Sequence, residues 1–192
     1  MHHPSHHDRW PRAARRWRAR GLWLSVVGVG LAGLSACGRS GPADPRGLHR
    51  GDPIGVSVVG VHDGDSLTGL TADRQQIKIR LDGIDAPELG QPFGKAAKRA
   101  LSEKIFGRQV VVVVKGHDLY GRLVGKVTLE GRDVGRELVR EGFAWRDPRF
   151  DHDAALAGLE QSARRAKAGL WADRSPTAPW DHRKARAGKG GT

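Results

Sequence analysis

The chain of 192 residues contains a single cysteine, Cys37. One cysteine excludes an intramolecular disulfide and a zinc site built from several cysteines, so the stability of the folded chain must come from packing. Long apolar runs are also scarce. The run at residues 21–36 has 16 residues, whereas a membrane-spanning helix needs about 20. An uncleaved membrane anchor is therefore disfavoured.

The position of Cys37, directly after this apolar run, suggests its role. A basic leader at residues 1–20 precedes the run, and the sequence Leu-Ser-Ala-Cys closes it. This layout is typical of a secretory signal. The Leu-Ser-Ala-Cys stretch resembles a bacterial lipoprotein box, which implies removal of a signal peptide at residues 1–36, lipid on the Cys37 sulfur and anchoring in the cell envelope. Cleavage near Ser35 without lipid is the alternative, and it would give a secreted protein.

Composition divides the remaining chain into three parts. Residues 37–53 are rich in Gly, Pro and charge, which predicts a flexible tether. Residues 54–173 are long enough for one ordinary domain. Residues 174–192 are rich in Pro, Ala, Lys and Gly and have little to bury, so we predict a disordered basic tail.

Positive charge is in excess along the whole chain, with a formal net charge of +12. Much of it stays after the leader, because the residues beyond Cys37 hold 27 basic and 20 acidic groups, a difference of +7. Such a surplus favours encounter with polyanions such as nucleic acid. An anionic membrane surface would satisfy it equally well.

The apolar pattern of residues 54–173 predicts both strands and helices. Ile77, Ile79 and Leu81 alternate with charged residues, which is typical of a strand with one buried face. The uninterrupted valine run at residues 110–114 predicts a fully buried strand. Strands are expected at residues 56–59, 67–70, 76–82, 110–114 and 123–129, and helices at residues 93–105, 134–139 and 156–166. This order predicts an α+β fold, a five-stranded OB-type β-barrel with about three helices packed outside.

Three short polar segments stand out within this domain: residues 63–66 (Asp-Gly-Asp-Ser), residues 80–88 (Arg-Leu-Asp-Gly-Ile-Asp-Ala-Pro-Glu) and residues 118–122 (Asp-Leu-Tyr-Gly-Arg). Each alone is ordinary, because Asp-Gly-Asp is a common hairpin turn and charges are common on the open face of a strand. In this order and at these intervals they resemble the catalytic signature of the staphylococcal nuclease family. The likeness covers about residues 56–171 and includes the segments at 131–144 and 169–171.

The resemblance implies an OB-fold nuclease that hydrolyses DNA and RNA with Ca²⁺ and leaves 3′-phosphate and 5′-hydroxyl ends. Asp65 and Asp85 would hold the ion, since Ca²⁺ takes about six to eight oxygen ligands and two carboxylates leave room for others. By resemblance, the backbone carbonyl of Ala86 would be a further ligand. Asp63 either reaches the metal through water or only forms the turn.

Two arginines and one glutamate would act on the phosphate and on the attacking water. Arg80 and Arg122 can each give paired hydrogen bonds to phosphate oxygens, and a guanidinium stays charged at any relevant pH. Glu88 corresponds to the family's proposed general base, and it either deprotonates the water or mainly orders it.

Aromatic residues near these segments would contact the nucleotide. Tyr120 matches a family position that contacts the nucleotide phosphate, and Phe150 falls where the family has a base-stacking tyrosine. Trp145 either contacts substrate or packs after the second helix. The chain departs from the family at Ala86, where a threonine is expected, and at Leu119, where a phosphate-contacting lysine is expected. These departures affect nucleotide affinity more than the reaction.

A non-catalytic nucleic-acid-binding OB-fold lipoprotein is the alternative function, because the fold alone does not decide activity. The complete set Asp65, Arg80, Asp85, Glu88 and Arg122 favours the enzyme. The expected partners are DNA and RNA as substrates and a membrane through the lipid. No feature of the sequence implies a protein partner, and a monomer is expected.

Overall fold

The structure is a computed structural model that describes residues 47–150 and 153–189. The predicted signal peptide, Cys37 and most of the tether lie outside these residues. Across the two described stretches, no helix has the length and apolar character needed to cross a membrane.

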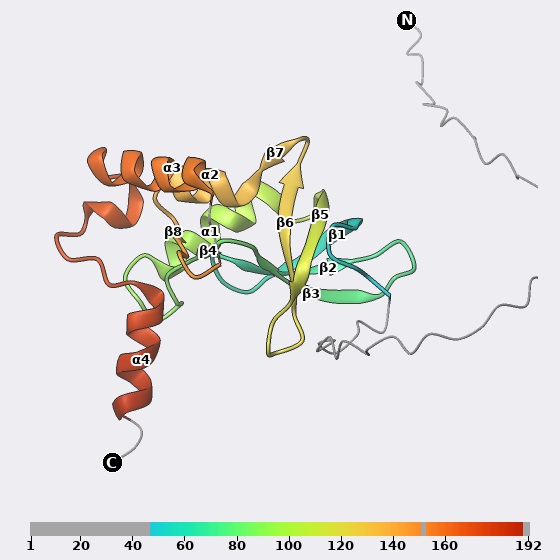
Figure 1. Ribbon diagram of the computed structural model, residues 1–192, viewed down its shortest axis with the longest axis horizontal. Helices are drawn as coiled ribbons and strands as arrows, with labels where there is room; N and C mark the ends of the chain where they lie inside the picture. Colours follow the sequence, from blue (N-terminus) through green and yellow to red (C-terminus); the bar gives the residue numbers. More distant parts are fainter. Residues whose placement is uncertain (1–46, 151–152, 190–192) are drawn as a thin grey trace, which may run out of the picture. The chain divides into compact units, whose positions relative to one another are not determined.

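Five long strands form the centre of the domain (Figure 1). They are β1 (Pro53–Val61), β2 (Ser66–Leu70), β3 (Gln76–Leu81), β5 (Gln109–His117) and β6 (Leu123–Leu129). Strands β3, β2, β1, β5 and β6 pair in this order as antiparallel neighbours, and β3 also pairs with β6 in parallel. This last pairing closes the sheet into a barrel. The predicted α+β fold with a five-stranded OB-type barrel is confirmed.

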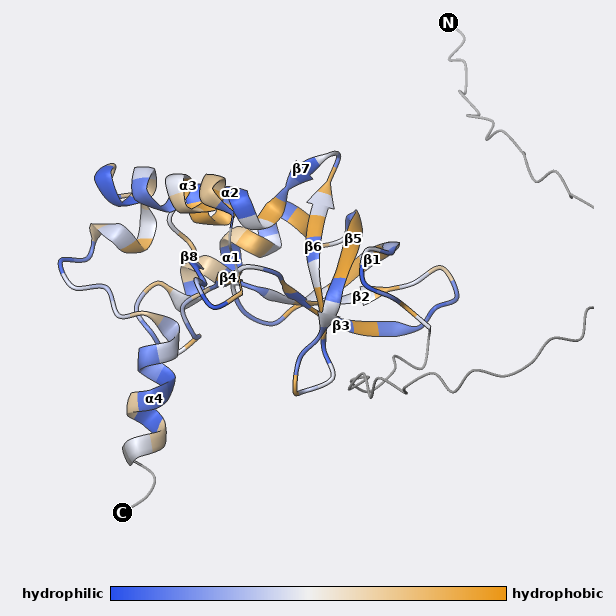
Figure 2. Cartoon of the chain, viewed as in Figure 1, coloured by the Kyte–Doolittle hydropathy of each residue, from blue (hydrophilic) through white to orange (hydrophobic). Residues whose placement is uncertain are grey.

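Alternation along each strand separates the core from the surface. On β3, Ile77, Ile79 and Leu81 are buried, as the sequence predicted. On β5, Val110, Val112 and Val114 are buried but Val111 is 45% exposed. The prediction of a fully buried valine strand is therefore wrong, because a barrel strand turns every second side chain outward. Figure 2 shows apolar residues concentrated on β5, β3 and the helices beside the barrel.

The helices lie outside the barrel: α1 (Gly94–Ile105), α2 (Val134–Arg140) and α3 (Ala154–Arg165), followed by the short 3₁₀ helix η1 (Gly169–Ala172). Side chains cap two of them at the N-terminus. The Asp133 carboxylate accepts a hydrogen bond from the Arg136 amide, and the Asp153 carboxylate accepts one from the Ala155 amide. The expected helices are confirmed to within a few residues.

Three further short strands connect these parts: β4 (Ile84–Asp85), β7 (Arg132–Asp133) and β8 (Trp145–Arg146). Strand β4 pairs with β8, and Asp85 lies opposite Trp145 in this pairing. The pairing ties the acidic segment after β3 to the segment after α2.

The C-terminal segment differs from the prediction. Instead of disorder, residues 179–189 form a fourth helix, α4 (Pro179–Lys189), which projects from the body of the domain (Figure 1). Proline suits the first turn of a helix because the amide it lacks would have no partner there. The preceding Ala178 is buried in a second apolar cluster with Trp145 and Trp171. The composition did not predict this, because only Ala178 and the neighbouring Trp180 pack a segment that is otherwise polar.

Candidate active site

Four separate elements bring the predicted acidic and basic residues together. Asp65 immediately precedes β2, Arg80 lies on β3, Asp85 ends β4 and Arg122 immediately precedes β6. The register of β2 and β3 pairs Ser66 with Arg80, which places Asp65 beside the arginine. Except for Asp85, these residues line one cleft of about 960 Å³, together with Glu88 and Asp63. The sequence therefore predicted correctly which segments converge.

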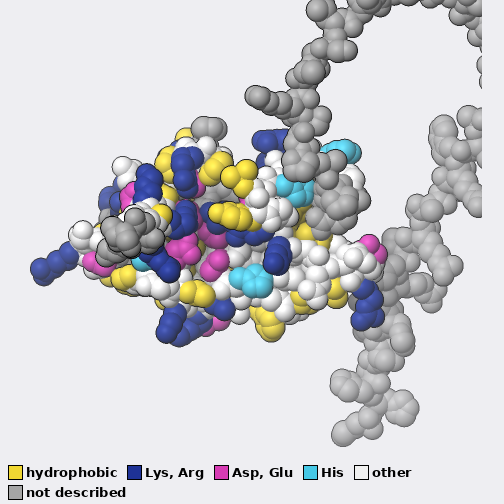
Figure 3. Space-filling model, turned by 90° about the horizontal axis from the view of Figure 1, so that it is seen from below, with side chains coloured by type: hydrophobic (Ala, Val, Ile, Leu, Met, Phe, Trp, Pro, Cys, Tyr) yellow, Lys and Arg dark blue, Asp and Glu magenta, His cyan; other side chains and the backbone are white. Residues whose placement is uncertain are grey.

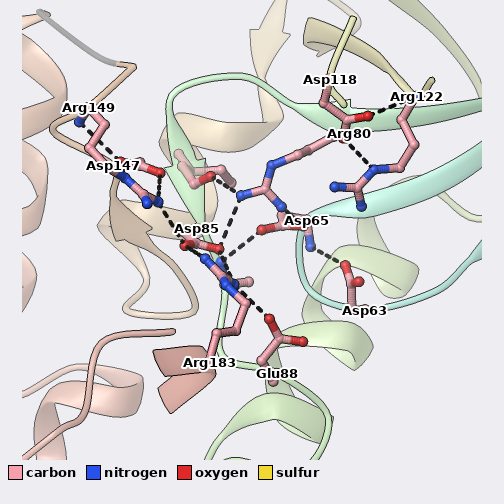
Figure 4. Close-up of polar contacts among 12 residues, drawn as sticks. Asp63, Asp65, Arg80, Asp85, Glu88, Asp118, Arg122, Asp147, Arg149 and Arg183 are labelled. Carbon is pink, nitrogen blue, oxygen red and sulfur yellow. Dashed lines mark hydrogen bonds and ion pairs between the residues drawn. The ribbon is translucent and has the colours of Figure 1, made fainter. Parts of the chain in front are cut away.

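Arg80 joins the two predicted metal-ligand carboxylates (Figure 4). Its Nη1 lies 2.9 Å from Oδ1 of Asp65, and its Nη2 lies 3.1 Å from Oδ1 of Asp85. The same Nη2 donates to the carbonyl of Ile84 at 3.2 Å. The Asp65 and Asp85 side chains are only 4% and 1% exposed. Two buried carboxylates thus share one largely buried guanidinium.

The pKa of Asp65 is raised to about 7, chiefly by burial; Arg80 opposes the rise, and the neighbouring carboxylates of Asp63 and Asp85 add to it. The Ala86 amide also opposes the rise, since it donates to Oδ2 of Asp65 at 2.9 Å. Burial therefore disfavours the charged form of Asp65. A cation bound at this carboxylate would favour it.

Close backbone approaches fix the loops that carry these groups. A Cβ atom on Gly64 would lie 2.6 Å from the Cβ of Ala86 and 2.6 Å from that of Ala97, so only glycine fits between Asp63 and Asp65. A Cβ atom on Gly94 would lie 1.9 Å from the carbonyl oxygen of Glu88. The start of α1 thus packs directly against the loop that presents Glu88.

Asp63 forms the turn before β2, which is one of the two roles that the sequence suggested for it. Its Oδ1 accepts a hydrogen bond from the Asp65 amide at 3.0 Å. It also lines the cleft. Among the described residues there is no group of three or more His, Cys, Asp or Glu side chains placed to hold a metal ion. A cation here would have two carboxylates, with backbone and water oxygens completing its ligands.

Glu88 lies at the edge of this cluster on a braced loop. Its amide donates to Oε1 of Gln91 at 2.8 Å, and Nε2 of Gln91 donates to the carbonyl of Thr177 at 3.2 Å. The Glu88 side chain is 36% exposed, so solvent reaches it. Its Oε1 accepts a hydrogen bond from Nη1 of Arg183 at 2.7 Å.

Arg122 is held at the other side of the cleft by Asp118. Its Nε lies 2.7 Å from Oδ2 of Asp118, and its backbone amide donates to Oδ1 of the same residue at 3.0 Å. The Tyr120 amide also donates to this Oδ1, at 2.9 Å. In Figure 4 the end of the Arg122 guanidinium points toward the carboxylate cluster. Asp118 therefore fixes the arginine through Nε, and the two Nη groups face the cleft.

The aromatic residues divide into exposed and packed ones. Tyr120 is 84% exposed and Phe150 is 69% exposed, and both line the cleft. Trp145 is buried, and its ring centroid lies 4.4 Å from that of Trp171 and 5.7 Å from that of Trp180. Of the two readings of Trp145, packing is the one that the structure shows.

Sequence reasoning missed the basic residues that complete the cluster. Arg183 on α4 contacts Asp85 and Glu88, and Arg149 lies 3.6 Å from Oδ2 of Asp85. Arg149 is itself held by Asp147, whose side chain is 1% exposed, at 2.6 Å. The signals available were Asp-Pro-Arg at residues 147–149 and Pro-Trp at residues 179–180. Neither sequence indicates by itself that Arg149 or Arg183 lies against the carboxylates of the barrel.

The surface around the cleft has a charge pattern suited to a polyanion. Figure 3 shows acidic side chains gathered near the middle of one face, with Lys and Arg side chains around them. Arg50 and Lys115 line one part of the cleft, and Arg149 and Arg183 line another. A phosphate chain would meet positive charge on either side of the acidic centre.

Comparison with known proteins gives one family. A family profile described as staphylococcal nuclease homologue matches residues 78–173. An uncharacterized endonuclease of Haemophilus influenzae is 37% identical over 127 residues, which cover 66% of this chain and 71% of that protein. An uncharacterized endonuclease of Escherichia coli O157:H7 is 38% identical over 130 residues, covering 66% of this chain and 84% of that protein. The staphylococcal-like nuclease CAN1 of Arabidopsis thaliana is 39% identical over 114 residues, but these cover only 35% of its length.

Proposed function

Because the chain belongs to the staphylococcal nuclease family, we propose that it is a calcium-dependent endonuclease that hydrolyses phosphodiester bonds of DNA and RNA and leaves 3′-phosphate ends. The observation that carries the proposal is the convergence of buried Asp65, two arginines and an accessible glutamate in one cleft, with the buried carboxylate of Asp85 joined to Asp65 through Arg80. A nucleic-acid-binding module has no need to bury carboxylates next to its polyanionic ligand, since they repel it.

The donor set fits Ca²⁺. Asp65 and Asp85 offer only oxygen, and hard cations such as Ca²⁺ prefer oxygen ligands. Burial raises the pKa of Asp65 despite Arg80, and a bound cation would favour the ionised form of this carboxylate. We propose Asp65, Asp85 and the carbonyl of Ala86 as the protein ligands. When bound, Ca²⁺ would neutralise charge on the phosphate as water attacks.

The side chains around the cation would then share the remaining work. Arg122 directs its Nη groups into the cleft, where they can donate to phosphate oxygens and stabilise the extra charge of the transition state. Arg80, held between the two carboxylates, would add positive charge beside the cation for the same phosphate. Glu88, at the accessible edge, accepts a proton from the attacking water or orders it, a role worth about 10² to 10⁴ in rate.

Tyr120 and Phe150 would hold the substrate on either side of the scissile phosphate. Both rings are exposed at the cleft, where a base or sugar can pack against them. Stacking of this kind is sequence-tolerant because every base has a π-face. It therefore supports action on DNA and RNA alike.

The test is hydrolysis of DNA and RNA by the full chain, in Ca²⁺ and in chelator, with analysis of the product ends. We expect cutting only with Ca²⁺, and products whose 5′ ends accept phosphate from a kinase without prior dephosphorylation. Arg132→Ala should cut as the wild type does, since Arg132 is 54% exposed and pairs with Glu137 away from the cleft. Cutting that persists in chelator, or 5′-phosphate products, would contradict the proposal.

We also propose that the protein is exported and anchored through lipid on Cys37, because the basic leader, the apolar run and the Leu-Ser-Ala-Cys sequence have the layout of a lipoprotein signal. Metabolic labelling with a radioactive fatty acid tests this. The wild-type chain should take up label and Cys37→Ser should not. Equal labelling of both would remove Cys37 as the lipid site.

A further inference from the structure

Arg183 of α4 binds the two carboxylates on which the proposed chemistry depends. Its Nη2 lies 2.5 Å from Oδ2 of Asp85, and its Nη1 lies 3.2 Å from Oδ1 of the same residue. The same Nη1 lies 2.7 Å from Oε1 of Glu88. One guanidinium therefore bridges a proposed metal ligand and the proposed base (Figure 4).

These contacts leave Asp85 without an oxygen directed at the cleft. Oδ1 accepts from Arg80 and Arg183, and Oδ2 accepts from Arg183 with Arg149 at 3.6 Å. The Asp85 side chain is only 1% exposed. A cation that takes Asp85 as a ligand must first displace one of these guanidinium groups.

Arg183 is the group best placed to leave. Arg80 is 19% exposed and is fixed by Asp65 and the Ile84 carbonyl as well as by Asp85. Arg183 is 43% exposed, and among the described residues its ion-pair partners are the two carboxylates of Asp85 and Glu88. Breaking its contacts exposes a guanidinium to water at little further cost, whereas moving Arg80 would leave Asp65 buried without its partner.

The start of α4 is held independently of Arg183. The ring of Trp180 packs against Trp145, and the guanidinium of Arg149 lies 5.5 Å above the Trp180 ring. The Thr177 carbonyl accepts from Gln91. Displacement of Arg183 can therefore free the later turns of α4 without detaching the segment.

We propose that Arg183 determines the cation affinity of this site: its guanidinium occupies Asp85 and Glu88 when no cation is bound, and a divalent cation binds by displacing it. The inference rests on the proposed cation site. A single bound Na⁺ or K⁺ brings no more charge than the guanidinium it replaces, so the exchange favours divalent ions. Displacement also releases Glu88, which makes the base available only when the cation is present.

The experiment is calorimetric titration of CaCl₂ into the full chain and into Arg183→Ala, Arg183→Gln and Arg186→Ala. We expect both Arg183 variants to bind Ca²⁺ about tenfold tighter than the wild type, since each charged hydrogen bond that the ion must displace reduces its apparent affinity. Arg186→Ala removes the same charge from an exposed position on α4 and should change the affinity less than twofold. Equal affinity in the wild type and both Arg183 variants would overturn the inference.

Hydrogen exchange in the wild-type chain gives a second readout that needs no substitution. Amides at residues 183–189 should exchange faster with Ca²⁺ than without it, because the ion releases the helix from the site. Unchanged or slower exchange would overturn the displacement.

These results separate the inference from the proposed function. Tighter Ca²⁺ binding by the Arg183 variants without hydrolysis of DNA by any protein would keep the inference and remove the nuclease. Calcium-dependent hydrolysis with equal Ca²⁺ affinity in the wild type and the Arg183 variants would keep the nuclease and remove the inference. Absence of Ca²⁺ binding in every variant would remove both.

Discussion

Replacing Arg80 by methionine tests how the carboxylate cluster is balanced. Among the described residues, Arg80 is the side chain that forms ion pairs with both Asp65 and Asp85, and these two side chains are 4% and 1% exposed. Breaking a buried ion pair by removing one partner costs about 3 to 5 kcal/mol. Two features lower the cost here: Arg183 still contacts Asp85, and Asp65 has a pKa of about 7 and can take up a proton.

We therefore expect Arg80→Met to lose about 3 kcal/mol of unfolding free energy at neutral pH without Ca²⁺, which lowers the melting temperature by about 10 °C. Urea denaturation and thermal melting measure the loss. Arg132→Met is the control, because an exposed pair such as Arg132 and Glu137 is worth about 1 kcal/mol or less. Adding Asp65→Asn to Arg80→Met should restore part of the loss, since it removes the unpaired charge. A loss below about 1 kcal/mol for Arg80→Met would refute the description of the cluster as a buried set of ion pairs.

Three further substitutions test other parts of the domain. Gly64→Ala places a Cβ 2.6 Å from two neighbouring Cβ atoms, so overpacking should cost about 1 to 3 kcal/mol in urea denaturation; Gly158→Ala, where nothing lies within 4 Å, is its control and should cause no loss. Burial acts to raise the pKa of Asp147, but hydrogen bonds from Arg149 outweigh it and lower the pKa below 3.8. A carboxyl group whose pKa is lower in the folded than in the unfolded chain stabilises the fold above the unfolded pKa, and this stabilisation is lost as the pH falls through the folded pKa. The difference in unfolding free energy between wild type and Asp147→Asn should therefore narrow below pH 3.8. A difference independent of pH would contradict this. Tyr120→Ala should weaken the binding of single-stranded DNA by about fivefold or more in fluorescence anisotropy, while Phe106→Ala, on the exposed end of α1, should leave it unchanged.

The barrel was predictable from local patterns, whereas the site formed by its acidic segments was implied by the resemblance to the nuclease family. Alternation on β3 sets which face is buried, and it directs Arg80 and Ile79 to opposite sides. Once β2 and β3 pair, Asp65 must lie beside Arg80. Position along the strands thus determines this part of the site.

The rest depends on contacts between residues far apart in the chain. Arg183 lies 98 residues from Asp85, and its approach requires the packing of Trp180 on Trp145. The composition of residues 174–192 is dominated by residues that rarely pack, so it predicted disorder instead. The exposure of Val111 also followed from barrel closure, which five valines in sequence do not reveal.

The proposed nuclease depends on Glu88, which acts on the water that attacks the phosphodiester bond. The most direct test compares wild type and Glu88→Gln in Ca²⁺, measuring single-turnover cleavage of DNA and DNA affinity on the same samples. We expect a rate about 10² to 10⁴ lower in the variant, with DNA affinity and melting temperature nearly unchanged, because Glu88 is partly exposed and acts chiefly in the transition state. Equal rates in the two proteins, or binding without cleavage in both, would contradict it.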